Sequence, residues 1–169
     1  MRFKIGDKII YPNQGVGTIE DIAVKKLGGS SNTEFYIVRL SDNDSNVMIP
    51  VDNAESVGLR ALSNEKVVEE LYDILGKKQE TTSDDWKVRY KSNSEKMSTG
   101  DIREVTLVMK ALFFLSQEKD LSFREKKMME RAMQLVVSEI AIVEKLDIEE
   151  VEQKVEDLLT ETYKQSNIA

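Results

Sequence analysis

The chain contains neither cysteine nor histidine. The absence of cysteine excludes disulfide bonds, thiolate metal sites and thiol nucleophiles. The absence of histidine removes the commonest general base and the commonest metal ligand of proteins. Hydrolytic triads and most zinc chemistry are therefore excluded. We predict a protein that is not an enzyme, with no catalytic residue, no metal site and no cofactor.

Long apolar runs are also missing from the 169 residues. A membrane-spanning helix needs about 20 consecutive apolar residues, and the chain has no such stretch. The N-terminus leads directly into a strand pattern, without the apolar segment of a signal peptide. The sequence therefore predicts a cytoplasmic protein that does not associate with membranes, long enough for one domain or two small ones.

The net charge of −7 argues against a protein that simply coats nucleic acid. The charge is unevenly distributed, however. Residues 86–135 hold eleven bases and seven acids, a local charge of +4, which leaves −11 for the rest of the chain. This pattern suggests weak, local DNA binding that needs a partner to hold it in place.

Residues 1–62 have the short apolar alternation of β-strands. The predicted strands are 8–11, 16–26, 34–40 and 47–51, separated by polar turns at 12–15, 28–32 and 41–46. Gly15 and Gly17 suit tight bends, where a Cβ atom would clash. Four or five short strands are typical of a small SH3- or Tudor-like β-barrel.

From residue 63 the periodicity becomes helical. Helices are predicted from Ser63 to Gly76, over 84–97, from Asp101, from Ser122 and over 147–164, with Ser63, Asp101 and Ser122 as N-caps. Residues 76–84 form a polar connection. The predicted fold is therefore α+β, with a barrel at 1–62 and a compact all-α bundle of four or five helices at 63–169.

The stretch from Asp84 to Lys91 contains the only tryptophan, Trp86. Its bases and second aromatic residue are Lys87, Arg89, Tyr90 and Lys91. A large apolar side chain beside cations suits contact with unstacked bases and phosphates. Trp86, Arg89 and Tyr90 are spaced to share one helix face. The alternative is a Trp86 buried in a helical core, with the bases as its solvated rim.

Two further surfaces carry a functional and a structural interpretation. Lys126 and Lys127 lie in the first turns of the helix capped by Ser122, where they can meet a phosphate or form a solvated face. In a small barrel, edge strands and rims commonly bind partner proteins. Lys25, Lys26 and Arg39 are candidate contacts there, although surface lysine also protects strand edges from aggregation.

Taken together, the chain resembles the CarD/CdnL family of bacterial transcription regulators, from the N-terminus to about residue 145 and more loosely to the end. The first half also looks like the polymerase-interacting module of transcription-repair coupling factors. The matching segments of the first half are Phe3-Lys4-Ile5-Gly6-Asp7, Tyr11-Pro12, Gly15-Val16-Gly17, Met48-Ile49-Pro50-Val51, Asn53-Ala54-Glu55 and Val57-Gly58-Leu59-Arg60. Those of the second half are Trp86, Arg89-Tyr90-Lys91, Asn93, Glu95-Lys96, Ser98, Gly100-Asp101, Leu121-Ser122, Glu125-Lys126 and Met128.

The resemblance implies a monomer whose barrel docks on the β-subunit lobe of RNA polymerase. It also implies a helical domain on promoter DNA near the −10 element, where a tryptophan wedge in the minor groove favours the open complex. We expect little sequence specificity, because no helix resembles a recognition helix rich in asparagine, glutamine and arginine. The implied DNA contacts are Trp86, Lys91 and Lys126, with Lys87, Arg89, Tyr90 and Lys127 beside them. The implied polymerase contacts are Lys25 and Met48, with Arg39 and Pro50 beside them; Met48 departs from members that have arginine there.

A second function fits the same two halves. The barrel can dock on polymerase or another protein while the helices bind a second protein, without touching DNA. The presence of Trp86, Lys91 and Lys126 favours the DNA-binding alternative.

Overall fold

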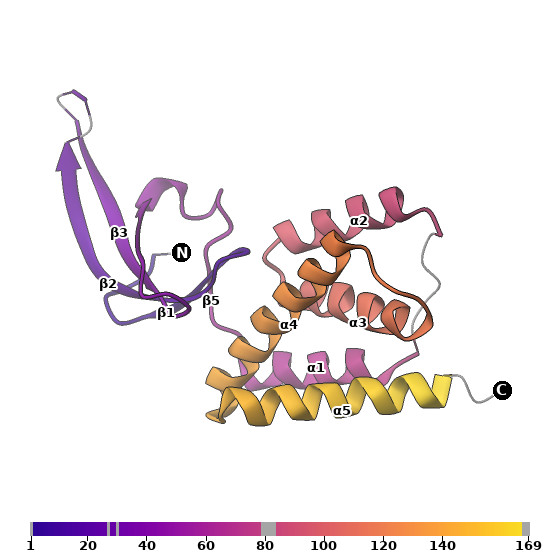
Figure 1. The fold of residues 1–169 in the computed structure, drawn as a ribbon. Coiled ribbons are helices and arrows are strands. Elements are labelled where there is room, and N and C mark those ends of the chain that lie inside the picture. Colours follow the sequence, from indigo (N-terminus) through magenta and orange to yellow (C-terminus); the bar gives the residue numbers. More distant parts are fainter. Residues whose placement is uncertain (1, 27, 30, 79–83, 167–169) are drawn as a thin grey trace. The chain divides into compact units, whose positions relative to one another are not determined.

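The computed structural model describes residues 2–26, 28–29, 31–78 and 84–166. The chain divides into two compact units, Met1–Leu62 and Ser63–Ala169. The first contains strands and the second contains helices, which confirms the predicted α+β class (Figure 1). The predicted hairpin tip at 28–32 and the predicted connection at 76–84 fall partly outside the described residues.

The first unit is a five-stranded antiparallel sheet with the strand order β4-β3-β2-β1-β5. Its strands are β1 (Lys8–Tyr11), β2 (Gly15–Lys26), β3 (Asn32–Leu40), β4 (Asn46–Pro50) and β5 (Arg60–Ala61), with a 3-10 turn at Val51–Asn53. A bulge between Ile19 and Asp21 shifts the register of the long β2–β3 hairpin, and such bulges bend a strand and increase its twist. The four predicted strands all form, and β5 adds two residues at the sheet edge.

Backbone geometry explains the turn between β1 and β2. Asn13 and Gly15 have φ angles of 62° and 94°, a region that glycine and asparagine tolerate best. Gly17 is constrained by packing instead, because a Cβ atom there would lie 2.6 Å from Cγ1 of Val38. The strand pairing therefore requires the absence of a side chain at position 17.

An apolar cluster forms the main core of the first unit, and a hydrogen bond connects it to the N-terminal segment. The buried members of the cluster are Phe3, Ile9, Ile19, Tyr36, Val38, Leu40, Ile49, Ala54 and Leu59. The hydroxyl of Tyr36 accepts a hydrogen bond from the backbone N–H of Phe3 at 3.0 Å. The two rings pack edge to face at 5.9 Å, so Tyr36 fixes the N-terminal segment to the sheet.

The second unit contains α1 (Glu65–Gly76), α2 (Trp86–Ser98), α3 (Ile102–Glu118), α4 (Phe123–Glu144) and α5 (Ile148–Ser166). Helix α3 contacts each of the other four helices. Its sequence has the wide apolar stripe that a central position requires. The buried core residues of this unit all lie between Val68 and Leu159, so the two units have separate cores.

Two of the three predicted helix caps form. Asp101 accepts from the N–H of Arg103 at 2.9 Å, and Ser122 accepts from the N–H of Glu125 at 3.2 Å. The predicted cap at Ser63 was wrong by one residue, because Asn64 caps α1. The backbone N–H and hydroxyl of Ser63 instead donate to the carboxylate of Glu139, which is buried in α4.

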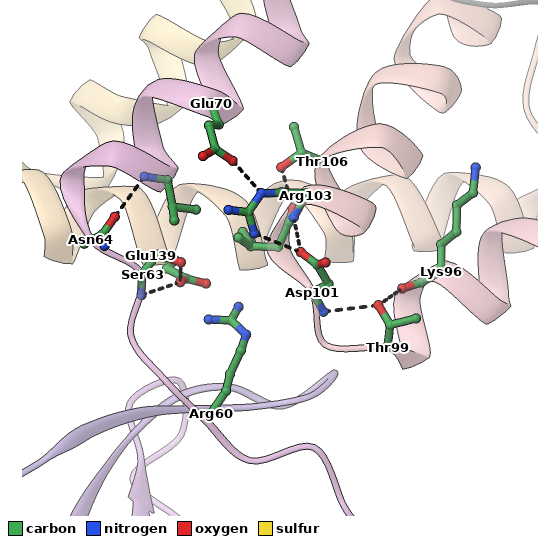
Figure 2. Close-up of polar contacts among 12 residues, drawn as sticks. Arg60, Ser63, Asn64, Glu70, Lys96, Thr99, Asp101, Arg103, Thr106 and Glu139 are labelled. Carbon is green, nitrogen blue, oxygen red and sulfur yellow. Dashed lines mark hydrogen bonds and ion pairs between the residues drawn. The ribbon is translucent and has the colours of Figure 1, made fainter. Parts of the chain in front are cut away.

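Polar contacts hold the start of α3 against α1 (Figure 2). Arg103 lies between two carboxylates, 2.5 Å from Glu70 of α1 and 3.8 Å from Asp101. Lys110, further along α3, is buried, and its ammonium donates to the carbonyl of Ile74 at 2.7 Å. It thereby caps the last turn of α1, whose carbonyls lack partners within the helix. None of the described helices is long and apolar enough to cross a membrane.

Candidate nucleic-acid interface

Helix α2 is held to the bundle by an unusually polar face. Its buried side chains are Arg89, Asn93 and Met97, which recur every four residues and so share one side. Only Met97 of these belongs to the apolar core. The attachment of the first half of α2 therefore depends on the partner of Arg89.

That partner is Glu125, in the first turn of α4. Arg89 Nε lies 2.7 Å from Glu125 Oε2, and a second guanidinium nitrogen lies 3.1 Å from Oε1. Arg89 is 6% exposed and Glu125 is 2% exposed. Glu125 also accepts from Ser122, whose hydroxyl caps α4. A buried bidentate ion pair thus joins the first turns of α2 and α4.

The ion pair shifts both side chains toward their charged forms. The Arg89 guanidinium holds the pKa of Glu125 below its ordinary value. Hydrogen bonds from Ser122 lower this pKa further, whereas burial alone would raise it. Glu125 in turn raises the pKa of Arg89, against the effect of burial. Both groups therefore remain charged in the folded protein.

Trp86 is the first residue of α2 and is 46% exposed. The alternative in which it is buried in the helical core is therefore wrong. Asp85 caps the helix by accepting from the N–H of Lys87 at 3.0 Å. Arg89 lies three residues after Trp86 in the same first turn, and its side chain is covered by Glu125 whereas that of Trp86 is exposed.

The other predicted residues of α2 form two rows along its surface. Tyr90 lies four residues after Trp86 and is half-buried, whereas Lys87 and Lys91 form an exposed row beside them. Arg89 differs from this group. Because it is buried against Glu125, its guanidinium is not presented to a phosphate, and the structure gives no support to its predicted DNA contact.

Helix α4 extends this surface. Lys126 and Lys127 are exposed in its first two turns, and Lys127 lies 3.8 Å from Glu130. The guanidinium of Arg124 lies over the ring of Tyr90, 5.9 Å from its centroid, and forms a second bridge between α2 and α4. The residues of the two helices that make up this α2–α4 surface are Trp86, Lys87, Tyr90, Lys91, Arg124, Lys126 and Lys127.

Fewer bases are free of contacts within the bundle than the charge of residues 86–135 predicts, and one further base, Arg124, bridges two helices. Arg89, Arg103 and Lys110 were counted in the basic middle of the chain, yet all three are engaged by groups within the bundle. Arg124 was not singled out. The cap at Ser122 was the available signal, because it places Arg124 in the first turn of α4.

The four predicted polymerase contacts lie together on one face of the sheet, called here the outer face. Cross-strand partners project to the same side, and Met48 and Pro50 of β4 pair with Ile37 and Phe35 of β3. Arg39 lies two residues after Ile37 in β3, so its side chain projects to the same face. It forms an ion pair with Glu20, with 3.1 Å between Nε and Oε1. The ammonium of Lys25 reaches across to 3.8 Å from the sulfur of Met48.

The outer face ends at an edge strand. Strand β4 is the last in the sheet order, and Met48 at its middle is 42% exposed. The face therefore offers an apolar centre with a lysine and an arginine at its margins. Among the described residues, no group of three or more acidic side chains is arranged to hold a metal ion.

Comparisons with known proteins match both units. The family described as CarD, C-terminal domain, matches residues 70–156, and the CarD-like/TRCF RID domain matches residues 3–63. A Bacillus subtilis (strain 168) protein named "Putative transcription factor YdeB" is 33% identical over 141 residues, which cover 83% of this chain and 92% of the relative. These matches cover the sheet and the helices in the same order, and the chain belongs to the CarD family of transcription regulators.

Proposed function

We propose that this protein binds RNA polymerase through the outer face of its sheet and stabilises the promoter open complex through its α2–α4 surface. In this proposal the outer face contacts the lobe of the polymerase β subunit. Trp86 enters the minor groove at the upstream edge of the bubble, near the −10 element. The CarD-like domains support a role in transcription through polymerase.

The observation that carries the DNA proposal is the exposure of Trp86 at the start of a well-anchored helix. A wedge must be apolar, exposed and rigidly held, because inserting it between base pairs costs a few kcal/mol of stacking energy. Trp86 is 46% exposed, and the Arg89–Glu125 ion pair fixes the same first turn of α2. Lys87 and Lys91 lie beside it to bind phosphates.

The distribution of charge supports a mechanism that depends on tethering. The chain carries a net charge of −7, so long-range attraction to DNA is weak. Docking of the sheet on polymerase would raise the effective concentration of the α2–α4 surface at the promoter without new contacts. Base-specific contacts are not required, since the cations of this surface recognise phosphates rather than sequence.

Replacing Trp86 by alanine should shorten the lifetime of the open complex several-fold relative to the wild-type protein, because the wedge is lost while the cations remain. The measurement is the half-life of a competitor-resistant complex of polymerase holoenzyme on a promoter with a −10 element. Val88→Ala is the matched control, since Val88 is an exposed apolar residue of the same helix turn on another side.

An unchanged half-life with Trp86→Ala would contradict the wedge. If the wild-type protein itself left the half-life unchanged while still binding the β subunit, the helices would instead bind a protein. A photoreactive group at position 86 separates these alternatives, because a crosslink to promoter DNA is expected only if the α2–α4 surface lies on DNA.

Met48→Glu should weaken binding to the β subunit about tenfold or more, because it places an unpaired carboxylate in the apolar centre of the proposed contact. The measurement is the affinity of the full chain for the purified β-subunit lobe. Val24→Glu is the matched control. Val24 is an exposed apolar residue of β2 that alternates to the opposite side from Lys25, so we expect no change in affinity. Equal affinities for all three proteins would place docking elsewhere.

A further inference from the structure

Phe123 is the most exposed large hydrophobic residue described in the chain. Its side chain is 75% exposed, more than the 46% of Trp86. It is the first residue of α4, directly after the Ser122 cap. A phenylalanine in this position is costly to leave in water, and it does not belong to the core of the bundle.

The surroundings of Phe123 are cationic. The ammonium of Lys127, one turn later, lies 5.5 Å from the centroid of its ring. Lys126 is three residues along and exposed, so these three side chains share the solvent face of α4. Glu125 projects from the opposite side of the helix and is buried. The first turn is also rigid, because Glu125 is held by both Arg89 and Ser122.

We propose that Phe123 stacks on an unpaired base of single-stranded DNA, while Lys126 and Lys127 bind the adjoining phosphates. This inference rests on the proposed DNA role of the α2–α4 surface and extends it from the duplex to the opened strand. In this proposal the two exposed aromatic residues have different targets, Trp86 at the edge of the duplex and Phe123 on a base that has left it.

The chemistry of the site favours a nucleic-acid strand over an apolar protein surface. Proteins that bind single strands combine aromatic rings, on which bases stack, with cations that follow the backbone. An apolar partner would have to desolvate Lys126 and cover the exposed ion pair of Lys127 with Glu130, which is unfavourable. Duplex DNA presents no free base face to a side chain on a helix surface, whereas a melted strand does.

The test compares three fluorescently labelled DNAs at low salt: a duplex, the same duplex with a single-stranded arm, and the arm alone. Phe123→Ala should lower the affinity for the armed duplex and for the single strand about tenfold, the effect expected for one stacked base. Its affinity for the plain duplex should stay unchanged. Phe123→Leu should behave like alanine, and Phe123→Tyr should behave like the wild-type protein.

A second measurement reports stacking directly. In a Trp86→Phe, Phe123→Trp double variant, the only tryptophan is at position 123. Its fluorescence should be quenched by the armed duplex and by the single strand, and much less by the plain duplex. Thermal unfolding followed by circular dichroism should be the same for all position-123 variants, since the side chain is exposed.

The outcomes separate the two proposals. If Trp86→Ala weakens DNA binding while Phe123→Ala binds all three DNAs like the wild-type protein, the stacking role of Phe123 is overturned and the DNA surface stands. If the wild-type protein binds none of the DNAs, alone or with polymerase present, both proposals fail. Equal loss of affinity with Phe123→Leu and Phe123→Ala, with Phe123→Tyr unaffected, would establish that the ring itself is required.

Discussion

Glu125→Ala should destabilise the helical unit by about 3–5 kcal/mol, the usual cost of leaving one half of a buried ion pair without its partner. The substitution removes the carboxylate that accepts two hydrogen bonds from the guanidinium of Arg89, at 2.7 and 3.1 Å, in a place where both side chains are almost fully covered. It also removes the acceptor for the Ser122 hydroxyl. Urea unfolding followed by circular dichroism at 222 nm measures the change.

The same pair makes stability depend on acid pH. Glu125 has a pKa held below its ordinary value near 4.5, chiefly by Arg89. The stabilisation it provides is therefore complete above that ordinary value and is lost as the pH falls through the lowered pKa of the folded state. The unfolding free energy of the wild-type protein should fall in this range, and that of Glu125→Ala should fall less steeply.

A double variant tests the interpretation. Replacing Arg89 by methionine and Glu125 by leucine together removes both charges and should recover most of the lost stability, as is common when buried ion pairs become apolar. If Glu125→Ala cost less than about 1 kcal/mol, the pair would behave like an exposed one. The anchoring role assigned here to Arg89 would then be wrong.

Leu112→Ala should cost about 2–5 kcal/mol, because it opens a cavity in the centre of the bundle. Leu112 is fully buried in α3, and α3 contacts every other helix of the unit. Such a loss is a large part of the 5–15 kcal/mol that stabilises a typical domain. Chemical denaturation of the full chain, compared with the wild-type protein, measures it.

Leu115→Ala provides the matched control in the same helix. The chemical change and the gain in helix propensity are identical, but Leu115 is only partly buried. Its cost should therefore be clearly smaller than that of Leu112→Ala. Equal costs at the two positions would mean that burial within α3 does not determine its contribution to stability.

The elements of the fold could be predicted from the sequence because local signals agreed with the packing. The turn at residues 12–15 carries the asparagine and glycine that its positive φ angles require. The apolar stripe of α3 has the period of a helix that is buried on several sides. Its N-cap, Asp101, directly precedes the helix and bonds to a residue only two positions away. Asn64 was missed as a cap because two neighbouring polar residues fit the same local pattern, and only the tertiary contact of Ser63 with Glu139 distinguishes them.

The burial of Arg89 could not be predicted in this way. Its partner is 36 residues away, and α2 has too few apolar residues to indicate which face points inward. The sequence from Asp84 to Lys91 is equally compatible with Arg89 being exposed beside Lys87 and Lys91. The same holds for Lys110, whose partner is a backbone carbonyl of α1 that no sequence pattern marks. Long-range polar pairs therefore determine which cations remain exposed on the helices.

The separate cores of the sheet and of the helices have a genetic consequence. The two buried clusters share no residue, so we expect the sheet to keep its own apolar core when the bundle unfolds. If the proposed docking holds, a protein with an unfolded bundle still occupies its place on the polymerase and excludes the intact copy. Substitutions that unfold the bundle should therefore act dominantly when co-expressed with the wild-type gene, whereas substitutions that unfold the sheet should be recessive.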